Sequence, residues 1–188
     1  AARPGRARTV IAPPTTPSTN ATDPKGTVME PRITRPYRHV PDGYRALLAL
    51  EASTRDDAVL PRAVQELVRL RASQVNGCGF CVDMHSHDAL EAGESIERLL
   101  AVSAWREAPW FTRSERAALA LTEELTRLAD RTDAVPDPVW DEAAAVFDEK
   151  ALMQLVLTVA TINAWNRISV ATRQVAGSHR RTATAGRP

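Results

Sequence analysis

The residues PRAVQELVRLRASQVNGCGFCVDMHSHDALEA, positions 61–92, decide the fold because they read as two consecutive helices separated by a short break. Proline suits the first helical position, and the apolar residues that follow recur with helical spacing. An Asn-Gly pair at 76–77 interrupts this pattern, and a new helix starts at or just before Cys78. The stretch therefore predicts that Cys78 and Cys81 lie at the N-terminus of a helix.

Helical periodicity also runs through the rest of the central region. No run there alternates apolar and polar residues in the manner of a half-buried strand. The sequence therefore predicts an all-α domain of about six or seven helices over residues 29–174. Besides the two helices above, helices are expected at about 42–52, at 95–106, from a Thr112-x-x-Glu115 capping box to about Leu128, from an Asp137 N-cap to Phe147, and at 150–173.

The two ends of the chain differ in composition from this domain. Residues 1–28 are rich in Ala, Arg, Pro and Thr and bury too little apolar surface to offset the entropy of ordering, so they predict a disordered extension. They are Arg-rich with no acid before Asp23, as in a transit peptide, but show no clear amphipathic period. Met29 is an alternative natural start. Residues 175–188 are small, polar and basic, and predict a flexible C-terminal tail.

Charge and cysteine content exclude several classes of protein. The 24 basic and 23 acidic residues are interspersed, so neither nucleic-acid binding nor anionic-membrane binding has electrostatic support. No apolar run reaches about 18 residues and no secretory signal is recognisable, so we expect a cytoplasmic protein with no membrane span. Two cysteines are too few for a secreted disulfide scaffold, and in a reducing compartment a C-x-x-C pair favours catalysis or metal binding.

The C-x-x-C pair and a histidine form the candidate reactive site. Cys78, Cys81 and His85 are spaced i, i+3 and i+7, which places them along one face of a helix. The free N–H groups and the positive dipole end of the first turn favour the thiolate form, and by this argument Cys78 is the more acidic thiol. His85 lies one turn beyond Cys81 and can accept or return its proton.

Two other interpretations of these residues stay open. Free cysteines are common in apolar cores, so the pair is also compatible with a plain structural role. Cys78, Cys81, His85 and His87 are four potential zinc ligands, although structural zinc sites usually draw their ligands from two separate elements. His87 also points about 200° around the helix from His85, so a redox pair is favoured over a zinc site.

Polar residues interrupt the apolar pattern of two other predicted helices. Glu66 is either a solvated surface glutamate or a buried carboxylate that faces the next helix and holds a proton near the cysteines. Asn163, Trp165 and Asn166 lie in the apolar last helix, where they either cross-link buried backbone or line a pocket or subunit contact near the histidine.

The spacing of the candidate residues resembles that of a known family, the alkylhydroperoxidase D (AhpD)-like branch of the carboxymuconolactone decarboxylase-like family. In this pattern Glu66 is followed after eleven residues by Cys78-x-x-Cys81, and after three more residues by His85. The resemblance covers roughly Pro41 to Arg173. Further motifs that look like those of the family are SQVNGCGFCVDMH at 73–85, AGE at 92–94, AWRE at 104–107 and TINAWNR at 161–167.

The resemblance implies an all-α, thiol-dependent hydroperoxide reductase. In the peroxidase branch the second cysteine, here Cys81, is the thiolate that attacks the peroxide and becomes a sulfenic acid, while the first, here Cys78, is the proton donor and resolving thiol. Glu66 and His85 then carry the proton relay. The resemblance also implies a homotrimer or homohexamer, no metal, haem or flavin cofactor, and two partners: a hydroperoxide and a dithiol reductant, which is a lipoyl adaptor, a thioredoxin-like protein or a small thiol.

One residue departs from the family pattern, and two alternative functions remain. Phe80 stands where the best-known peroxidase members have a histidine between the cysteines. The first alternative is a carboxymuconolactone decarboxylase-like lyase that uses proton transfer by His85 and Glu66, although that branch typically lacks the C-x-x-C pair. The second is a non-enzymatic redox-sensing or zinc-binding oligomer.

Overall fold

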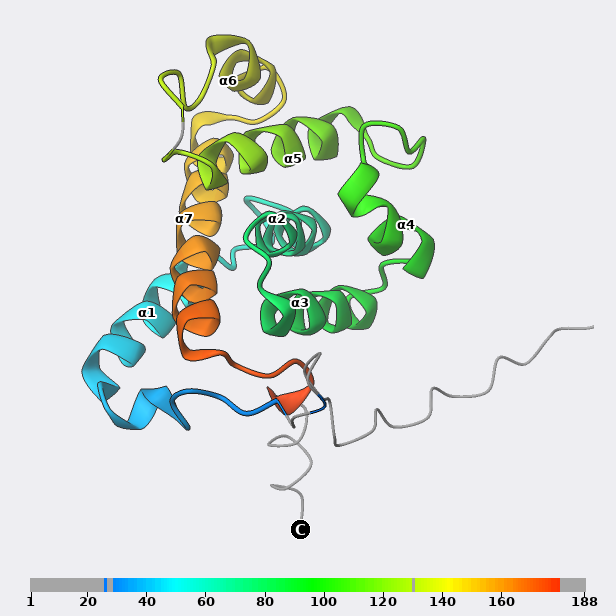
Figure 1. Cartoon of the computed structure of the whole chain (residues 1–188). Coiled ribbons are helices and arrows are strands. Elements are labelled where there is room, and N and C mark those ends of the chain that lie inside the picture. Colours follow the sequence, from blue (N-terminus) through cyan, green and yellow to red (C-terminus); the bar gives the residue numbers. More distant parts are fainter. Residues whose placement is uncertain (1–25, 27–28, 130, 180–188) are drawn as a thin grey trace, which may run out of the picture.

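The computed structural model describes residue 26, residues 29–129 and residues 131–179, and every regular element in this part of the chain is helical (Figure 1). The predicted all-α class is therefore confirmed, whereas most of the predicted extension 1–28 and residues 180–188 lie outside the described residues. The elements in chain order are η1 (Pro36–Arg38), α1 (Pro41–Ser53), α2 (Arg62–Val75), α3 (Gly79–Glu91), α4 (Ile96–Ala101), η2 (Val102–Ala104), α5 (Arg113–Thr126), α6 (Asp137–Ala144) and α7 (Glu149–Thr172).

Helix α2 is the centre of the fold. Figure 1 shows it end-on, with α3, α5 and α7 around it, and it packs against each of these three helices. Polar as well as apolar side chains of α2 are therefore enclosed, and each buried polar group needs a hydrogen-bond partner. The buried residues of α2 are Val64, Gln65, Glu66, Leu67, Val68, Arg69, Leu70, Ala72 and Ser73.

Two apolar clusters fix the position of α2. One cluster joins α2 to α5 and α7, and includes Val68, Leu121 and Leu155. The other joins α2 to α3, α5 and the segment of α4 and η2, and includes Leu67 and Val102. Full burial of each such side chain contributes about 1.5–3 kcal/mol, so α2 is held from both sides and its polar residues have defined neighbours.

The helix limits agree with the predicted helices at most ends. The capping box is confirmed, because Thr112 accepts from the backbone N–H of Glu115 and the Glu115 side chain accepts from the N–H of Thr112. The predicted helix 95–106 is wrong at its end, where the last turn tightens into η2, as is common at helix C-termini. The predicted Asp137 N-cap is also wrong: Pro136 holds the cap position and Asp137 is already helical.

Helix α1 lies apart from the core. None of its residues is fully buried, and it contacts only η1 and α7 to any extent (Figure 1). Its clearest contact joins the ring of Tyr44 to that of Trp165 on α7, with centroids 5.4 Å apart. No helix in the described part of the chain has both the length and the apolar character needed to cross a membrane.

Two segments near the chain ends lie together, and we call residues 29–40 and 173–179 the terminal strap. The backbone N–H of Arg32 donates to the carbonyl of Thr172 (2.8 Å), and the Gln174 amide donates to the carbonyl of Ile33 (3.1 Å). Arg35 and Arg173 both adopt left-handed backbone conformations, with φ of 52° and 53°. These conformations are uncommon for residues other than glycine, and they turn each segment at the end of a helical element.

Candidate functional site

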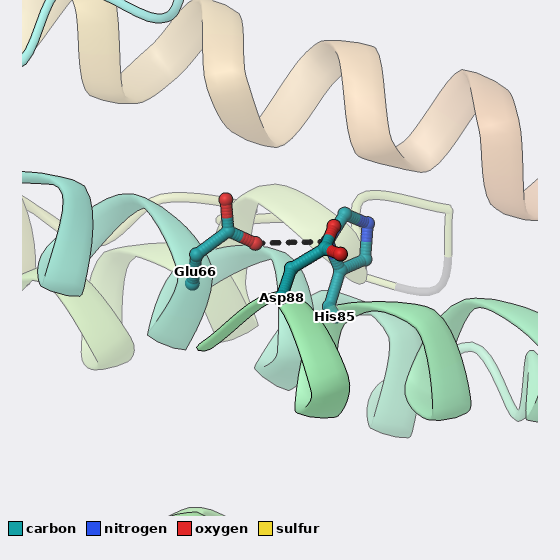
Figure 2. A group of neighbouring side chains, drawn as sticks. All are labelled: Glu66, His85 and Asp88. Carbon is teal, nitrogen blue, oxygen red and sulfur yellow. Dashed lines mark hydrogen bonds and ion pairs between the residues drawn. The ribbon is translucent and has the colours of Figure 1, made fainter. Parts of the chain in front are cut away.

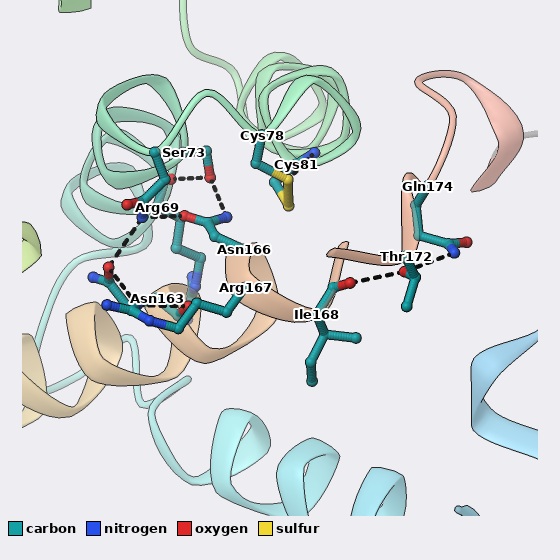
Figure 3. The surroundings of a disulfide bond; sticks show 11 residues. Arg69, Ser73, Cys78, Cys81, Asn163, Asn166, Arg167, Ile168, Thr172 and Gln174 are labelled. Carbon is teal, nitrogen blue, oxygen red and sulfur yellow. Dashed lines mark hydrogen bonds between the residues drawn. A yellow bond between two sulfur atoms is a disulfide. The ribbon is translucent and has the colours of Figure 1, made fainter. Parts of the chain in front are cut away.

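The cysteine pair lies where α2 and α3 meet. Gly77, with φ of +65°, follows the end of α2, and Cys78 is the N-cap of α3. Cys78 and Cys81 form a disulfide with a Cα separation of 5.3 Å, which is ordinary for such a bond (Figure 3). The Sγ of Cys78 also accepts from the N–H of Cys81 (3.3 Å). The predicted position of the pair at a helix N-terminus is thus what the structure shows.

Glu66 is buried, with 1% of its surface exposed, so the solvated alternative is wrong. One carboxylate oxygen accepts from the Arg69 guanidinium (2.9 Å), and the other lies 3.0 Å from Nδ1 of His85 on α3 (Figure 2). Burial by itself would raise the pKa of Glu66, but the hydrogen bond and charge of His85 and the charges of Arg69 and Arg55 together hold that pKa below its usual value. Glu66 is therefore an ionised acceptor at neutral pH.

An ionised Glu66 fixes the proton arrangement on His85. A carboxylate only accepts hydrogen bonds, so Nδ1 of His85 carries a hydrogen and donates it to Glu66. In the neutral imidazole Nε2 is then the nitrogen with the free lone pair. This Nε2 is enclosed and has no hydrogen-bond partner among the described residues. One ring nitrogen of His85 is thus bonded to a carboxylate, and the other has no hydrogen-bond partner among the described residues.

Cys81 and His85 both line a cavity of about 490 Å³, whereas Cys78 and Glu66 do not. Apolar surface dominates the cavity wall, which α1, α2, α3, α7 and the terminal strap build together. Trp165 is part of this wall, as one of the two interpretations of that residue predicts. The second cysteine and the histidine therefore border the same cavity, although each is only about 1% exposed.

The two asparagines of α7 bond mainly with other side chains, and the predicted link to buried backbone is found at Asn163 alone, whose amide donates to the carbonyl of Val159 (2.9 Å). The Asn76 amide donates to the side-chain oxygens of Asn163 (3.0 Å) and Asn166 (2.8 Å). The Asn166 amide donates to the hydroxyl of Ser73 (3.1 Å) (Figure 3). These bonds tie α7 to the last turn of α2 and to the residues that lead into Cys78. The asparagines therefore position the cysteines.

Sequence reasoning missed Arg69, Ser73 and Asn76. The first two follow Glu66 at i+3 and i+7, so they share its face of α2, and this spacing is the signal that could have found them. Asn76 was interpreted only as part of a helix break. Its side-chain partners lie almost ninety positions away in the sequence, and no local pattern indicates them.

The four potential zinc ligands, the alternative that the sequence disfavoured, do not come together. Cys78 and Cys81 are joined to each other, and His87 is largely exposed, with its Nδ1 2.7 Å from the carbonyl of Asp83. In the described part of the chain, the group of side chains close enough to share a metal ion is Glu66, His85 and Asp88. The Arg69 guanidinium already pairs with Glu66 in this group, and its positive charge opposes a bound cation.

The all-helical fold, with a buried Glu-His pair next to a C-x-x-C disulfide, defines a class of thiol proteins. Comparison with known proteins shows which family within this class the chain belongs to. The model of the Carboxymuconolactone decarboxylase family matches residues 41–124. Over 135 residues the chain is 37% identical to the uncharacterized protein YdfG of Bacillus subtilis (strain 168), an alignment that covers 72% of this chain and 90% of YdfG. The chain belongs to the carboxymuconolactone decarboxylase family.

Solved structures place the chain more narrowly, among AhpD-like proteins. A crystal structure of a protein of unknown function from Agrobacterium tumefaciens, named as a candidate antioxidant defence protein AhpD, has a TM-score of 0.73 and 34% identity, covering 78% of this chain and 98% of that one. The debrominase Bmp8 has a TM-score of 0.65 at 22% identity, covering 77% of this chain and 76% of its own. Bmp8 supports the fold alone.

Proposed function

We propose that the protein is a thiol-dependent hydroperoxide reductase that works through the Cys78 and Cys81 pair. The observation that carries the proposal is the unpaired Nε2 of His85, which lies one helical turn beyond Cys81 on the wall of the same cavity. Glu66, ionised and hydrogen-bonded to the other ring nitrogen, keeps this imidazole in the tautomer that can take a proton.

The proposed cycle begins with the reduced dithiol. The Cys81 thiolate attacks one oxygen of the hydroperoxide, the O–O bond breaks, and the departing alkoxide takes a proton and leaves as an alcohol. Cys81 is now a sulfenic acid. The Cys78 thiol attacks its sulfur, the S–S bond forms, and water leaves. An external dithiol then returns two electrons and two protons and restores both thiols.

The lining of the cavity supports Cys81 as the attacking thiol. Both cysteines are almost fully buried, but Cys81 borders the cavity and Cys78 does not, so a peroxide in the cavity lies nearer to the second cysteine. Cys78, as the N-cap residue, has the position from which it can resolve the sulfenic acid without a change of fold. This assignment follows the family resemblance and differs from the helix-dipole argument, which considered acidity and ignored access.

His85 and Glu66 are proposed to move the proton. The neutral imidazole takes the proton of Cys81 at Nε2, and the resulting cation is stabilised by Glu66 at Nδ1. The same proton then serves the leaving alkoxide. Phe80 has no group that can share this task, so the relay rests on His85. We further propose that a homotrimer or homohexamer acts in the cytoplasm with a dithiol reductant.

Two cysteine variants test the cycle. With cumene hydroperoxide and a dithiol reductant, Cys81→Ser should lose peroxide reduction down to the level without protein. Cys78→Ser should accumulate a sulfenic acid on Cys81 that dimedone traps and mass spectrometry locates. Full activity in Cys81→Ser, or dimedone on Cys78 in the wild type, would overturn the assignment.

A pH profile tests the relay separately. The pH at which alkylation of Cys81 by iodoacetamide becomes fast should be higher in Glu66→Gln than in the wild type. The reason is that an amide stabilises the protonated imidazole less than a carboxylate does. Glu123→Gln, which alters another buried carboxylate, is the matched control. Superimposable profiles for Glu66→Gln and the wild type would remove Glu66 from the relay.

A further inference from the structure

Three side chains that are common metal ligands converge between α2 and α3: Glu66 on α2, and His85 and Asp88 on α3 (Figure 2). The ligand atoms that they offer lie within 4.8 Å of one another. Nδ1 of His85 is 3.0 Å from Oε2 of Glu66 and 3.9 Å from Oδ2 of Asp88. Two ligands of one tetrahedral zinc ion, each about 2.0–2.2 Å from the metal, are roughly 3.3–3.6 Å apart. The group therefore has nearly the spacing of a divalent-metal site.

The Arg69 guanidinium lies against this group in a fixed orientation. One terminal nitrogen donates to Oε1 of Glu66 (2.9 Å), and the other donates to the hydroxyl of Thr54 (3.3 Å) and to the side-chain oxygen of Gln65 (3.3 Å). Thr54 and Gln65 are each 1% exposed, so both acceptors are themselves held by the packed core. Because a guanidinium is planar and always charged, these bonds fix a permanent positive charge beside Glu66.

A contribution to stability does not account for this buried ion pair. The Arg69 side chain is 3% exposed and the Glu66 side chain is 1% exposed. The desolvation of two such charges can exceed the attraction between them, and well-packed apolar residues of similar volume are often at least as stabilising. A role in the site, rather than in the fold, accounts for a charged residue at position 69.

We propose that Arg69 takes the place of a metal ion: Glu66, His85 and Asp88 form a latent site for divalent transition metals, and the Arg69 guanidinium keeps this site closed. An imidazole together with two carboxylates is a ligand set that suits zinc and cobalt. The guanidinium supplies positive charge to the two neighbouring carboxylates, which a bound metal would otherwise supply.

Arg69 opposes a metal ion in two ways. Charges of +1 and +2 about 5 Å apart repel strongly even at an effective dielectric constant of about 20. The guanidinium also engages Oε1 of Glu66, one of the two oxygens that this carboxylate can offer. Arg55 is a second cation on the cavity wall, but it pairs with Glu51 (2.6 Å) and its side chain is 40% exposed. Solvent and Glu51 weaken the effect of Arg55, so Arg69 decides whether a metal binds.

A closed metal site keeps His85 available for proton transfer. This consequence rests on the proposed function, whereas the closed site itself does not. A metal ion binds a histidine nitrogen through its lone pair and displaces the hydrogen there. Zinc at Nδ1 would break the hydrogen bond from His85 to Glu66 and would replace the neutral base with a metal-bound imidazole.

Titration of the full chain with cobalt and with zinc tests the inference without turnover. The protein is kept oxidised, because the disulfide between Cys78 and Cys81 prevents the thiolates from binding metal. Arg69→Met removes the charge and keeps much of the length, and Arg69→Lys keeps the charge. Arg71→Met, which removes the arginine 2.6 Å from the Glu123 carboxylate, is the matched control. Calorimetry gives the dissociation constant, and the visible absorption of cobalt reports its coordination.

Arg69→Met should bind one cobalt or zinc ion at least about a hundredfold more tightly than the wild type, since the repulsion from the lost charge is gone. Arg69→Lys and Arg71→Met should bind as weakly as the wild type. Addition of Glu66→Gln to Arg69→Met should abolish the gain, which would place the ion at this group rather than at exposed histidines.

The inference would be overturned by wild-type binding that Glu66→Gln abolishes, by no gain in Arg69→Met, or by an equal gain in Arg69→Lys. Because Arg69→Met leaves Glu66 buried without its arginine, circular dichroism follows each variant in cobalt and in chelator. An Arg69→Met chain that folds only with cobalt would support the closed site, and one that stays unfolded in cobalt would count against it. The expected metal binding in a protein without peroxide reduction would support the role of Arg69 and refute the proposed function.

Discussion

Two buried glutamates of this protein have much in common and differ in one respect. Glu66 on α2 and Glu123 on α5 are each at most 5% exposed, and both carboxylates are surrounded by nitrogen donors. For Glu123, as for Glu66, burial alone would raise the pKa, and hydrogen bonds from its partners hold it below the usual value. The two glutamates differ in whether the hydrogen-bond network around them ends in satisfied groups or in an atom without a partner among the described residues.

The network around Glu123 is closed. One oxygen accepts from Arg71 (2.7 Å) and from the indole of Trp105 (2.9 Å), and the other accepts from Arg106 (2.7 Å). The network around Glu66 continues through His85 to a nitrogen that has no partner within the described part of the chain, at a cavity that Cys81 also lines. A buried carboxylate is therefore not in itself a functional signal. The signal is a chain of hydrogen bonds that ends unsatisfied beside a reactive atom.

The largest expected effect comes from breaking the open network at its end. His85→Gln should slow reduction of cumene hydroperoxide by about 10²- to 10⁴-fold, the usual contribution of a general acid-base group, because glutamine cannot take the thiol proton. Stopped-flow measurement of single-turnover rates checks this. Glu123→Gln, which perturbs the closed network, should retain a rate close to that of the wild type. A His85→Gln rate within twofold of the wild type would remove the distinction between the two networks.

Breaking the closed network should cost stability instead. Glu123→Ala leaves Arg71 poorly paired in a mostly buried position, and such losses cost about 3–5 kcal/mol. Urea denaturation of the reduced protein measures the change in the free energy of unfolding. Single-turnover reduction at a urea concentration where the variant is fully folded should be nearly unchanged. A loss below about 1 kcal/mol would mean that this network contributes little to the fold.

Acid should weaken both networks. Both glutamates have a pKa below the ordinary value of 4.5, so the unfolded chain binds their protons at higher pH than the native protein does. Each ionised glutamate thus stabilises the protein above that value, and this stability is lost as the pH falls through the lowered pKa. Urea denaturation between pH 7 and pH 3 should show a flatter pH dependence in Glu66→Gln and in Glu123→Gln. A pH dependence identical to that of the wild type would contradict the lowered pKa.

The smallest effect should come from one donor of the closed network. Trp105→Phe keeps an aromatic ring in the core beside Arg106, but removes the second ring of the indole and with it the N–H that donates to Glu123. The free energy of unfolding should fall by about 1–3 kcal/mol from the lost hydrogen bond and packing, less than for Glu123→Ala, since Glu123 keeps its two arginines. Trp140→Phe, at an exposed position, is the control for urea denaturation. A change as large as that of Glu123→Ala would show that the indole is the principal partner.

Local signals predicted most of the fold and three residues of the site. Helical periodicity, prolines and the Thr112 capping box located the helices, because these features act within a few residues of one another. The spacing of Cys78, Cys81 and His85 likewise lies within one helix, so the sequence alone predicts that these three residues share a face. The sequence did not predict that the helix expected at 95–106 divides into α4 and the 3₁₀ turn η2. Val102 and Trp105 are buried there by tertiary packing, which local sequence patterns do not indicate.

Long-range contacts account for what the sequence could not predict. The burial of Glu66 depends on α3 packing against α2, so the residue pattern alone favoured a solvated surface glutamate over the buried carboxylate that the structure shows. The bond from Gln174 to Ile33 joins residues 141 positions apart, and nothing local indicates it. The terminal strap consequently had no counterpart in the sequence-based prediction, which treated residues 175–188 as a tail.

The short connection between α2 and α3 sets a limit on how this protein can change. Glu66, Arg69 and Ser73 occupy positions i, i+3 and i+7 of one helix, and the cysteines and His85 repeat that spacing on the next. The two faces meet only because residues 76–78 join the helices at one length. Within this connection the backbone N–H of Cys78 donates to the carbonyl of Ser73 (2.9 Å), so an inserted residue would separate the first cysteine from the last turn of α2. The length of the connection therefore constrains the site as strongly as the identity of the residues along the two faces does.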